Sequence, residues 1–295
     1  MRQFDEHTIT EAVIERLAKT QNARLRTVMS ALVGHLHDFV REVQLTEAEW
    51  RTAIDFLTRV GQKSDDKRQE FILLSDTLGV SILVDAINHR QPKGVTETTV
   101  LGPFYVENPP EQPLGADISG GLQGEKLFIE GKVHSPSGKP VAGAAVDVWH
   151  SDNEGYYDVQ RNDLSGPALR ARFRTDQNGR FWFWTIMPRS YPVPHDGPVG
   201  EMLRVTERHP FRPAHVHFRI EAPEFETLVT HVFVAGDPYL ESDAVFAVKE
   251  SLIAEFPQMP PGVAPDGTEM KQPWRCLNYR FGLKPIVEAA EHVSC

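Results

Sequence analysis

The sequence is poor in cysteine, in positive charge and in long apolar runs. Its 295 residues include two cysteines, Cys276 and Cys295, which are too few for a disulfide framework and fit a reducing compartment. The 31 lysines and arginines against 41 aspartates and glutamates give a formal net charge of −10, which argues against nucleic-acid binding. No eighteen apolar residues run together, and the N-terminus lacks the uncharged core of a signal peptide. We therefore expect a cytoplasmic protein without a membrane span, whose partner is a small molecule or another protein.

The first part of the chain has a helical pattern. Apolar residues recur every three or four positions along residues 25–43, which predicts an amphipathic helix of about five turns. Thr46, followed three residues later by Glu49, forms a capping box that starts a second helix. Further helices are expected over residues 71–78 and 80–87. Apolar stripes of this kind usually pack against other helices in a core, and we expect the same here.

The pattern changes after the loop at residues 89–94. From there, short β-branched and aromatic runs alternate with turn residues, as expected for the strands of a β-sandwich. The pair Asn178-Gly179 is typical of a hairpin turn between two strands. Two connections, residues 152–167 and 187–212, are too long for simple turns, so we expect them to carry function.

These two patterns predict an α+β fold with two domains. A helical N-terminal domain is expected over residues 1–95, followed over residues 96–295 by a β-sandwich domain of mixed topology with long loops. The composition, 40% hydrophobic and 24% charged, is that of a soluble globular protein.

Two histidines, His215 and His217, lie two positions apart in a run that reads as a half-buried strand. Residues i and i+2 of a strand share a face, so both imidazoles could bind one metal ion. A solvated pair on a polar strand face is the alternative, because short motifs of this kind often occur without a metal.

Each long loop contributes tyrosine near its start. Tyr156 and Tyr157 follow Gly155 in the first loop, and Tyr191 stands in the second. A loop tyrosine taken alone is most often a packing residue with its hydroxyl in water. Two phenolates with two imidazoles would instead form an anionic donor set without thiolate. Because ionising a phenol requires a strongly charged, oxygen-preferring cation, and zinc, calcium and magnesium prefer other donors, this set favours non-haem Fe(III).

A carboxylate stands in an apolar helical run at Leu73-Leu74-Ser75-Asp76. A buried aspartate normally has a partner. Asp76 therefore either caps a helix or faces a ligand site.

Five motifs, in order within residues 70–255, resemble those of the intradiol ring-cleavage dioxygenases. Agreement of five ordered motifs by chance is improbable, whereas the pair of histidines alone would be weak evidence for the family. The motifs are Leu101-Gly102-Pro103-Phe104-Tyr105, Asp147-Val148-Trp149-His150 leading into Gly155-Tyr156-Tyr157, Tyr191 after Met187-Pro188, Arg212-Pro213-Ala214-His215-Val216-His217, and Ala235-Gly236-Asp237-Pro238-Tyr239. The resemblance implies that O2 cleaves an aromatic ring between two hydroxylated carbons.

The resemblance also implies one non-haem Fe(III) per subunit. Its protein ligands would be Tyr157, Tyr191, His215 and His217. Tyr157 is preferred to Tyr156 because the family ligand is the second residue after the glycine.

Two further residues have roles implied by the family. Arg212 would lie beside the bound substrate, where a planar cation suits a developing oxyanion, and Tyr191 would also act as a base toward the substrate. Catechol-cleaving members have a glutamine sixteen residues after the first histidine ligand, but here that position is His231. We expect His231 to contact the metal ligands rather than the metal.

The family's pocket positions map onto nine residues, most of them apolar: Leu73, Asp76, Val100, Gly102, Phe104, Pro192, Val193, Arg212 and Val245. Asp76 discriminates among substrates, because a carboxylate can accept a hydrogen bond from a third ring hydroxyl. We therefore expect benzene-1,2,4-triol (hydroxyquinol) as the substrate and 3-hydroxy-cis,cis-muconate, the enol of maleylacetate, as the product. Catechol or a chlorinated catechol is the alternative substrate within the family. A non-catalytic β-sandwich binding module is the alternative outside it.

The resemblance extends to assembly. Family members pair through their N-terminal helices, which implies a homodimer here, and a tunnel at that interface can hold a phospholipid. The apolar stripe of residues 25–43 fits either such an interface or an internal core.

Overall fold

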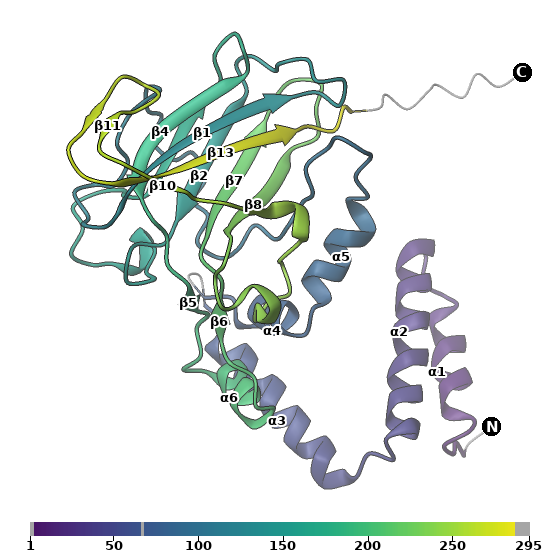
Figure 1. Cartoon of the computed structure of the whole chain (residues 1–295). Coiled ribbons are helices and arrows are strands. Elements are labelled where there is room, and N and C mark those ends of the chain that lie inside the picture. The colour runs from purple at the N-terminus through teal and green to yellow at the C-terminus, as the bar shows by residue number, and fades with distance from the viewer. Residues whose placement is uncertain (1–2, 66–67, 287–295) are drawn as a thin grey trace, which may run out of the picture. The chain divides into compact units, whose positions relative to one another are not determined.

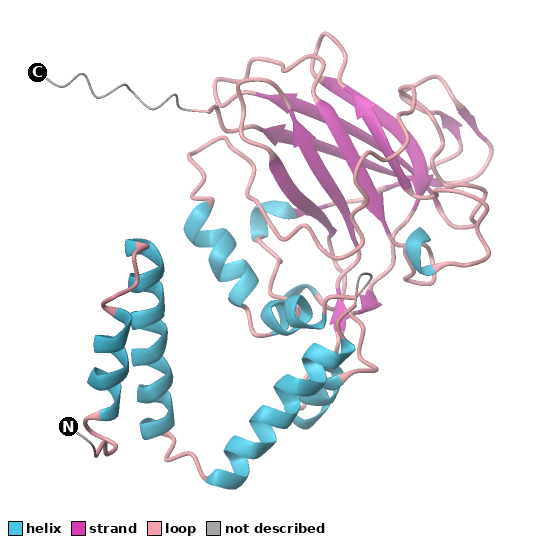
Figure 2. Cartoon of the chain, turned by 180° about the vertical axis from the view of Figure 1, so that it is seen from behind, coloured by secondary structure: helices cyan, strands magenta, loops and turns pink. Residues whose placement is uncertain are grey.

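A computed structural model describes residues 3–65 and 68–286 of the chain. They form two compact units, one ending at Gln62 and the other beginning at Lys63. Figure 1 follows the chain by residue number, and Figure 2 shows its helices and strands from behind. The boundary expected between residues 95 and 96 stays a prediction.

Helices make up most of the first unit: α1 (Ile9–Leu17), α2 (Ala23–Glu42) and α3 (Glu47–Lys63), whose last residue falls in the second unit. Asn22 caps α2, because its side chain accepts a hydrogen bond from the Leu25 amide at 2.9 Å. The capping box predicted for the second helix is confirmed. The Thr46 amide donates to Glu49 Oε2 at 2.9 Å, and the Glu49 amide donates to Thr46 Oγ1 at 3.3 Å.

The predicted apolar stripes lie on the surface of the chain. Seven apolar side chains of α2 are between 43% and 52% exposed: Leu25, Val28, Leu32, Leu36, Phe39, Val40 and Val43, which follows the helix end. Trp50, Ile54 and Leu57 of α3 are exposed to a similar degree. Internal core packing was therefore the wrong expectation for these side chains. The period of a stripe shows which face avoids water, but it does not show what covers that face.

The second unit begins with two short helices, α4 (Glu70–Thr77) and α5 (Val80–Asn88). They are separated by Gly79, whose φ of +75° lies in the left-handed region that ends helices. Among the described residues, no helix combines the length and the apolarity that a membrane crossing requires.

Two sheets form the sandwich seen in Figure 1. The first has the order β3 (Arg170–Arg174), β2 (Ala145–His150), β7 (His215–Glu221), β8 (Leu228–Val234) and β9 (Ile253–Ala254). The second has the order β10 (Gln258–Met259), β13 (Trp274–Gly282), β1 (Lys126–His134) and β4 (Arg180–Ile186). The pairs β1·β13 and β8·β9 are parallel and the other pairs are antiparallel. The expected α+β fold with a mixed-topology sandwich is confirmed.

The core between the sheets decides which way β7 presents its histidines. Val216, Phe218 and Ile220 are buried in that core with side chains from both sheets. Because successive side chains of a strand point to opposite faces, His215 and His217 lie on the other face of the same sheet. A polar pair thus stays out of the apolar core without any irregularity in the strand.

The long connections carry short elements of their own. They include β5 (Tyr191–Pro192), α6 (Pro198–Val205) and β6 (Phe211–Arg212), and the C-terminal part adds β11 (Gly262–Val263) and β12 (Glu269–Met270). In Figure 1, β5 and β6 lie with α4 and α6 at one end of the sandwich. At this end the second long loop, through α6, contacts α4.

The hairpin predicted at Asn178-Gly179 is wrong. The turn forms, with Gly179 at φ +71° and Asp176 Oδ1 accepting from the Asn178 and Arg180 amides at 2.8 Å each. However, the strands on either side, β3 and β4, belong to different sheets. Turn chemistry fixes where the chain reverses, whereas the core decides whether the flanking strands pair.

Candidate metal centre and active site

Three neighbouring strands place aromatic and imidazole rings in one row. His217 of β7 is directly opposite Trp149 of β2 on one side and His231 of β8 on the other. His215 is opposite Phe233 of β8. The side chains of His215 and His217 are 1% exposed, so the two histidines are not a solvated pair.

Four donor atoms converge beside this row. Tyr157 Oη lies 3.0 Å from His217 Nε2, 3.4 Å from His215 Nε2 and 3.3 Å from Tyr191 Oη. The two imidazole Nε2 atoms are 3.1 Å apart. Tyr157 is fully buried whereas Tyr156 is 52% exposed. The structure therefore brings together the four side chains expected as ligands, and it places Tyr156 elsewhere.

The two tyrosines meet because their loops approach at a glycine. Gly155 has φ +92°, and a Cβ on it would lie 2.8 Å from Tyr191 Cβ, so a larger residue would push the loops apart. The Tyr157 amide donates to Gln160 Oε1 at 2.9 Å. Tyr191 lies on β5, where its backbone pairs with Arg212 on β6. Each tyrosine is thus fixed by local backbone structure.

Burial favours the neutral forms of His215, His217 and Tyr157. It lowers the pKa of His215 and of His217 well below the usual value, and the nearby Arg212 cation lowers both further. Burial, followed by the effect of Tyr191, raises the pKa of Tyr157 well above its usual value. Neutral imidazoles are ready to bind a metal. The Tyr157 phenol, by contrast, ionises only beside a strong positive charge.

The donor set fits a small, highly charged metal ion. Donor atoms bound at about 2 Å from one centre lie roughly 3 Å apart, which matches the spacing of the four Oη and Nε2 atoms. The set contains no thiolate, and its two phenolic oxygens match a hard cation. The structure thus supports a non-haem metal site built from Tyr157, Tyr191, His215 and His217.

His231 lies behind the two histidines. Its ring centroid is 4.1 Å from that of His217 and 4.7 Å from that of His215, and its side chain is fully buried. Possible ligand atoms of these three histidines lie within 4.8 Å of one another. The expectation that His231 contacts the ligands rather than the metal stays a prediction.

Arg212 is buried against a carboxylate and the donor cluster. Its Nε donates to Asp243 Oδ1 at 3.1 Å, its Nη2 donates to Asp243 Oδ2 at 3.4 Å, and its Nη1 lies 3.3 Å from His215 Nε2. Burial disfavours the charge, but the Asp243 carboxylate and the nearby tyrosines raise the pKa of Arg212 overall. A permanent cation therefore stands at the edge of the metal site.

A cavity of about 170 Å³ opens beside Tyr191 and Arg212. A cavity of about 150 Å³ in another protein binds benzene, so this volume suits one aromatic ring. Eight of the nine residues expected in the pocket line it: Leu73, Asp76, Val100, Gly102, Phe104, Val193, Arg212 and Val245. Of the four expected metal ligands, Tyr191 alone is among the lining residues.

Pro192 is not among the residues that line this cavity, and its side chain is exposed. Tyr191 and Val193, on either side of it, both face the cavity, so the alternation of an extended segment turns Pro192 away. Five lining residues were not expected: Arg68, Gln69, Ile72, Pro103 and Pro194.

The residue spacing in and before helix α4 could have predicted part of this cavity wall from the sequence. Ile72, Leu73 and Asp76 follow Gln69 by three, four and seven positions, the spacing of one helix face. Ile72 is 53% exposed and Asp76 is 8% exposed. The same face therefore runs from the mouth of the cavity to its interior.

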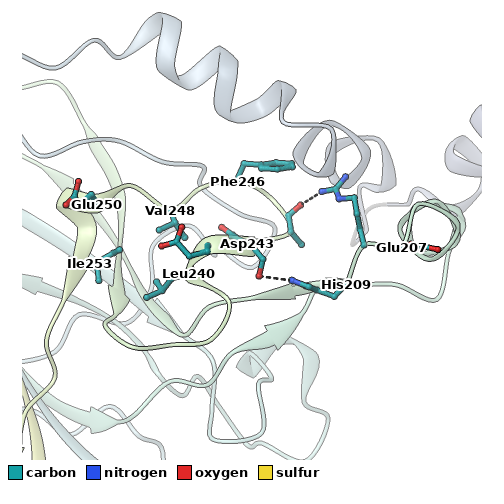
Figure 3. A pocket seen from close by; sticks show the side chains of 12 residues that line it. Glu207, His209, Leu240, Asp243, Phe246, Val248, Glu250 and Ile253 are labelled. Atoms are coloured by element: carbon teal, nitrogen blue, oxygen red, sulfur yellow. Dashed lines mark hydrogen bonds between the residues drawn. The ribbon is translucent and has the colours of Figure 1, made fainter. Parts of the chain in front are cut away.

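A second hollow, of about 850 Å³, lies between residues 207–209 and 240–253 (Figure 3). Its polar groups are largely bonded within the protein. His209 Nε2 lies 2.9 Å from Ser242 Oγ, and the Arg208 guanidinium donates to carbonyl oxygens of Thr77 and Ala244. Its lining includes Asp243, which bonds Arg212, whereas Tyr191 and Arg212 themselves line the smaller cavity. The smaller cavity is therefore the better candidate for chemistry.

Comparison with known proteins identifies the class to which this fold and site belong. The family described as "Dioxygenase" matches residues 100–284, and the one described as "Catechol dioxygenase N terminus" matches residues 22–96. The chain belongs to the intradiol dioxygenase family and is an enzyme of that class. The resemblance inferred from the motifs is confirmed.

Within the family, the chain is similar to enzymes that act on hydroxyquinols. It is 56% identical to 6-chlorohydroxyquinol 1,2-dioxygenase of Cupriavidus pinatubonensis over 87% of this chain and 93% of that protein. It is 50% identical to hydroxyquinol 1,2-dioxygenase of Corynebacterium glutamicum over 95% of this chain and 94% of that protein. The solved structure of hydroxyquinol 1,2-dioxygenase from Pseudomonas putida matches with a TM-score of 0.91 and 47% identity, covering 95% of this chain and 99% of that one.

Proposed function

We propose that this enzyme uses O2 and Fe(III) to cleave benzene-1,2,4-triol between its two vicinal hydroxylated carbons. Both oxygen atoms enter the product, 3-hydroxy-cis,cis-muconate, which is the enol of maleylacetate. The observation that carries the proposal is a carboxylate, Asp76, in the wall of an otherwise mostly apolar cavity that also contains Tyr191 and Arg212. The similarity to relatives named hydroxyquinol 1,2-dioxygenase supports it.

Tyr157, Tyr191, His215 and His217 would hold one Fe(III) per subunit. The ion would act as a Lewis acid that shifts electron density in the diolate toward reaction with O2. Tyr191 lines the cavity while Tyr157 is fully buried. This difference supports Tyr191 Oη as the phenolic oxygen that would accept a proton from a substrate hydroxyl.

Arg212 would orient the substrate and stabilise negative charge on its oxygen. Asp243 occupies the Nε and Nη2 atoms of the guanidinium, which leaves Nη1 on the side of His215. A fixed donor of this kind favours the charge that develops during reaction and needs no rearrangement at that moment.

Asp76 would recognise the third hydroxyl of the ring by accepting a hydrogen bond from it. Burial raises the pKa of its carboxyl, and a hydrogen bond with Ser81 and the nearby Arg212 oppose that shift. A buried polar group that loses its partner costs free energy, so catechol, which lacks the third hydroxyl, is bound less well. The apolar walls around Asp76, from Leu73, Val100 and Phe104, accept the ring itself.

The test compares kcat/KM for benzene-1,2,4-triol and for catechol in the wild type and in Asp76→Ala. We expect the wild type to prefer the triol by about 10²-fold or more, and the variant to lose most of that preference. The matched control is Leu73→Ala, which widens the same wall without removing a polar group. A triol preference that is unchanged in Asp76→Ala would show that Asp76 does not recognise the third hydroxyl. A wild type that turns over catechol or a chlorinated catechol better than the triol would favour the alternative substrate.

We also propose that two copies pair through the N-terminal helices. The half-exposed apolar side chains of α2 and α3 support this, because so much apolar surface on neighbouring turns is typical of an interface. The first unit also has a hollow of about 430 Å³ lined by Ile9, Val40, Leu45 and Trp50, with Arg41 beside them. Polar residues complete its lining, namely Glu6, His37, Thr46 and Glu47. The apolar part of the wall suits acyl chains and Arg41 suits a phosphate, so we expect a phospholipid, which solvent extraction and mass spectrometry of the purified protein would reveal.

We further propose that the enzyme acts in the cytoplasm. Cys276 is a buried free thiol, and an unpaired thiol suits a reducing compartment. Fractionation of cells that produce the protein tests this location.

A further inference from the structure

We propose that Trp149 is a positioning residue for His217, which it holds by ring stacking where a metal-binding histidine is usually held by a hydrogen bond. The inference rests on the proposed iron site, because it concerns how one ligand of that site is oriented. It assigns a role to the tryptophan of the Asp147-Val148-Trp149-His150 motif, which the reaction itself does not use.

The two histidines differ in how their rings are fixed. His215 Nδ1 lies 2.7 Å from the Pro213 carbonyl oxygen, a contact that sets the tautomer and leaves Nε2 free for a metal. His217 Nδ1 is buried and has no hydrogen-bond partner among the described residues. Since χ2 of histidine has a broad torsional profile, some other contact must fix the direction of His217 Nε2.

Trp149 provides that contact. The indole and the His217 imidazole have centroids 4.6 Å apart and planes inclined by only 17°. The pairing follows from the sheet, because Trp149 and His217 are directly opposite residues of β2 and β7. Trp149 is 1% exposed, so the stack is shielded from water.

Other neighbours confine the imidazole without aligning its plane. His231 meets His217 edge to face, with centroids 4.1 Å apart and planes at 84°. Gly102 approaches the ring edge so closely that a Cβ on it would lie 3.2 Å from His217 Cε1. Trp149 is thus the neighbour whose flat face sets the rotation of the ring about χ2.

The Trp149 indole is itself in contact with Tyr105. Its centroid lies 5.0 Å from that of Tyr105, whose hydroxyl donates to Asp147 Oδ2 at 3.0 Å. Asp147 is 1% exposed and accepts two hydrogen bonds from Arg172, at 2.5 and 2.8 Å. A buried carboxylate held by a bidentate arginine is a rigid support, so the stack has little freedom to shift.

The experiment measures Fe(III) affinity by competition with a chelator, together with the phenolate-to-iron charge-transfer absorption. Trp149→Phe keeps a flat ring and should retain Fe(III) within about threefold of the wild type. Trp149→Leu keeps apolar bulk but loses the flat face, and should weaken binding by about 10- to 100-fold, the range for losing an outer contact of a metal ligand. The charge-transfer band should move in Trp149→Leu and stay in place in Trp149→Phe.

Trp274→Leu is the matched control for lost core packing. Trp274 is 2% exposed and packs against Phe128 and Trp184 in a separate cluster. This variant should lower the unfolding temperature as Trp149→Leu does while leaving Fe(III) affinity unchanged. Should Trp149→Leu not fold, Trp149→Met is the second variant, because its long and flexible thioether fills irregular space without presenting a flat face. Its Fe(III) affinity is then compared with that of Trp149→Phe in the same way.

The outcomes separate this inference from the proposed function. A wild type that takes up no Fe(III) overturns both. A wild type that binds Fe(III), with a folded Trp149→Leu or Trp149→Met variant that binds it equally tightly, overturns the positioning role alone.

Discussion

At the residue scale, Tyr156 and Tyr157 are neighbours with opposite environments, the first half exposed and the second fully buried beside His217. Tyr157→Phe removes one of the two proposed phenolate ligands, so we expect a weaker and shifted charge-transfer band, because Tyr191 remains, and a fall in kcat of at least about 10²-fold. Tyr156→Phe removes the same hydroxyl one position away and should leave both unchanged. Visible spectra and turnover measured on iron-loaded protein compare the two variants. If Tyr156→Phe weakened and shifted the band instead, the ligand assignment would move by one residue.

A second residue-scale prediction concerns His150 and acid stability. His150 is 1% exposed, and burial lowers the pKa of its imidazole from 6.5 to about 4. Between these pH values the unfolded chain binds a proton that the folded chain does not. Stability is therefore full above about pH 6.5 and falls as the pH drops toward 4, and at pH 5 His150 alone accounts for a loss of about 2 kcal/mol.

Urea unfolding of the iron-free protein at pH 7.5 and pH 5 measures this effect. His150→Gln can keep the contacts with the Ser151 carbonyl and Thr185 but does not titrate, so its stability should fall less between the two pH values than that of the wild type. Equal losses in the two proteins would show that His150 does not drive the acid sensitivity.

At the element scale, the loop of residues 152–167 depends on Gly155. Gly155→Ala would place a Cβ 2.8 Å from Tyr191 Cβ in a backbone with φ +92°, so we expect a loss of about 1–3 kcal/mol of stability and weaker iron binding. Gly166→Ala is the control in the same loop, since a Cβ there meets nothing within 4 Å. Thermal unfolding and iron content measure both variants. A Gly155→Ala protein that matched the control would show that the loops have room to move apart.

In helix α4, the spacing of apolar residues predicts a helix but does not show whether those residues pack in a core or line a cavity. Its spacing indicates a helix, but the aliphatic residues Ile72 and Leu73 suit a core and a cavity wall equally well. Asp76 is the exception, because a carboxylate buried among apolar residues needs a polar partner. That residue indicated a ligand site from the sequence, whereas Gln69 and Ile72 became part of the cavity only in the folded structure.

At the scale of the whole molecule, the exposed stripe of α2 predicts a dimer that one charge can break. Leu36 is 52% exposed, and a buried glutamate in a symmetric interface would occur twice. Leu36→Glu should therefore convert the dimer to a monomer in sedimentation experiments. Thr27→Glu, nine residues earlier and so on the opposite side of the helix, should leave the dimer intact. A wild type that is monomeric at micromolar concentration would contradict the interface.

The sequence by itself determined the local features of this protein. The period of apolar residues defined the helices, and β-branched runs defined most of the strands. The two-residue spacing of His215 and His217 placed them on one strand face. The residue types also favoured the metal, since phenols and imidazoles without thiolates suit a hard cation. Five ordered motifs indicated the family to which the chain belongs.

Only the tertiary structure decided what depends on residues far apart in the chain. It placed Tyr157 and Tyr191 within hydrogen-bond distance of each other, assigned β3 and β4 to different sheets, and left the stripe of α2 exposed. It also stacked Trp149 on His217. Sequence patterns report the preference of each residue for water or for a neighbour a few positions away. The partner that satisfies this preference is selected by packing across the whole core, which no local pattern contains.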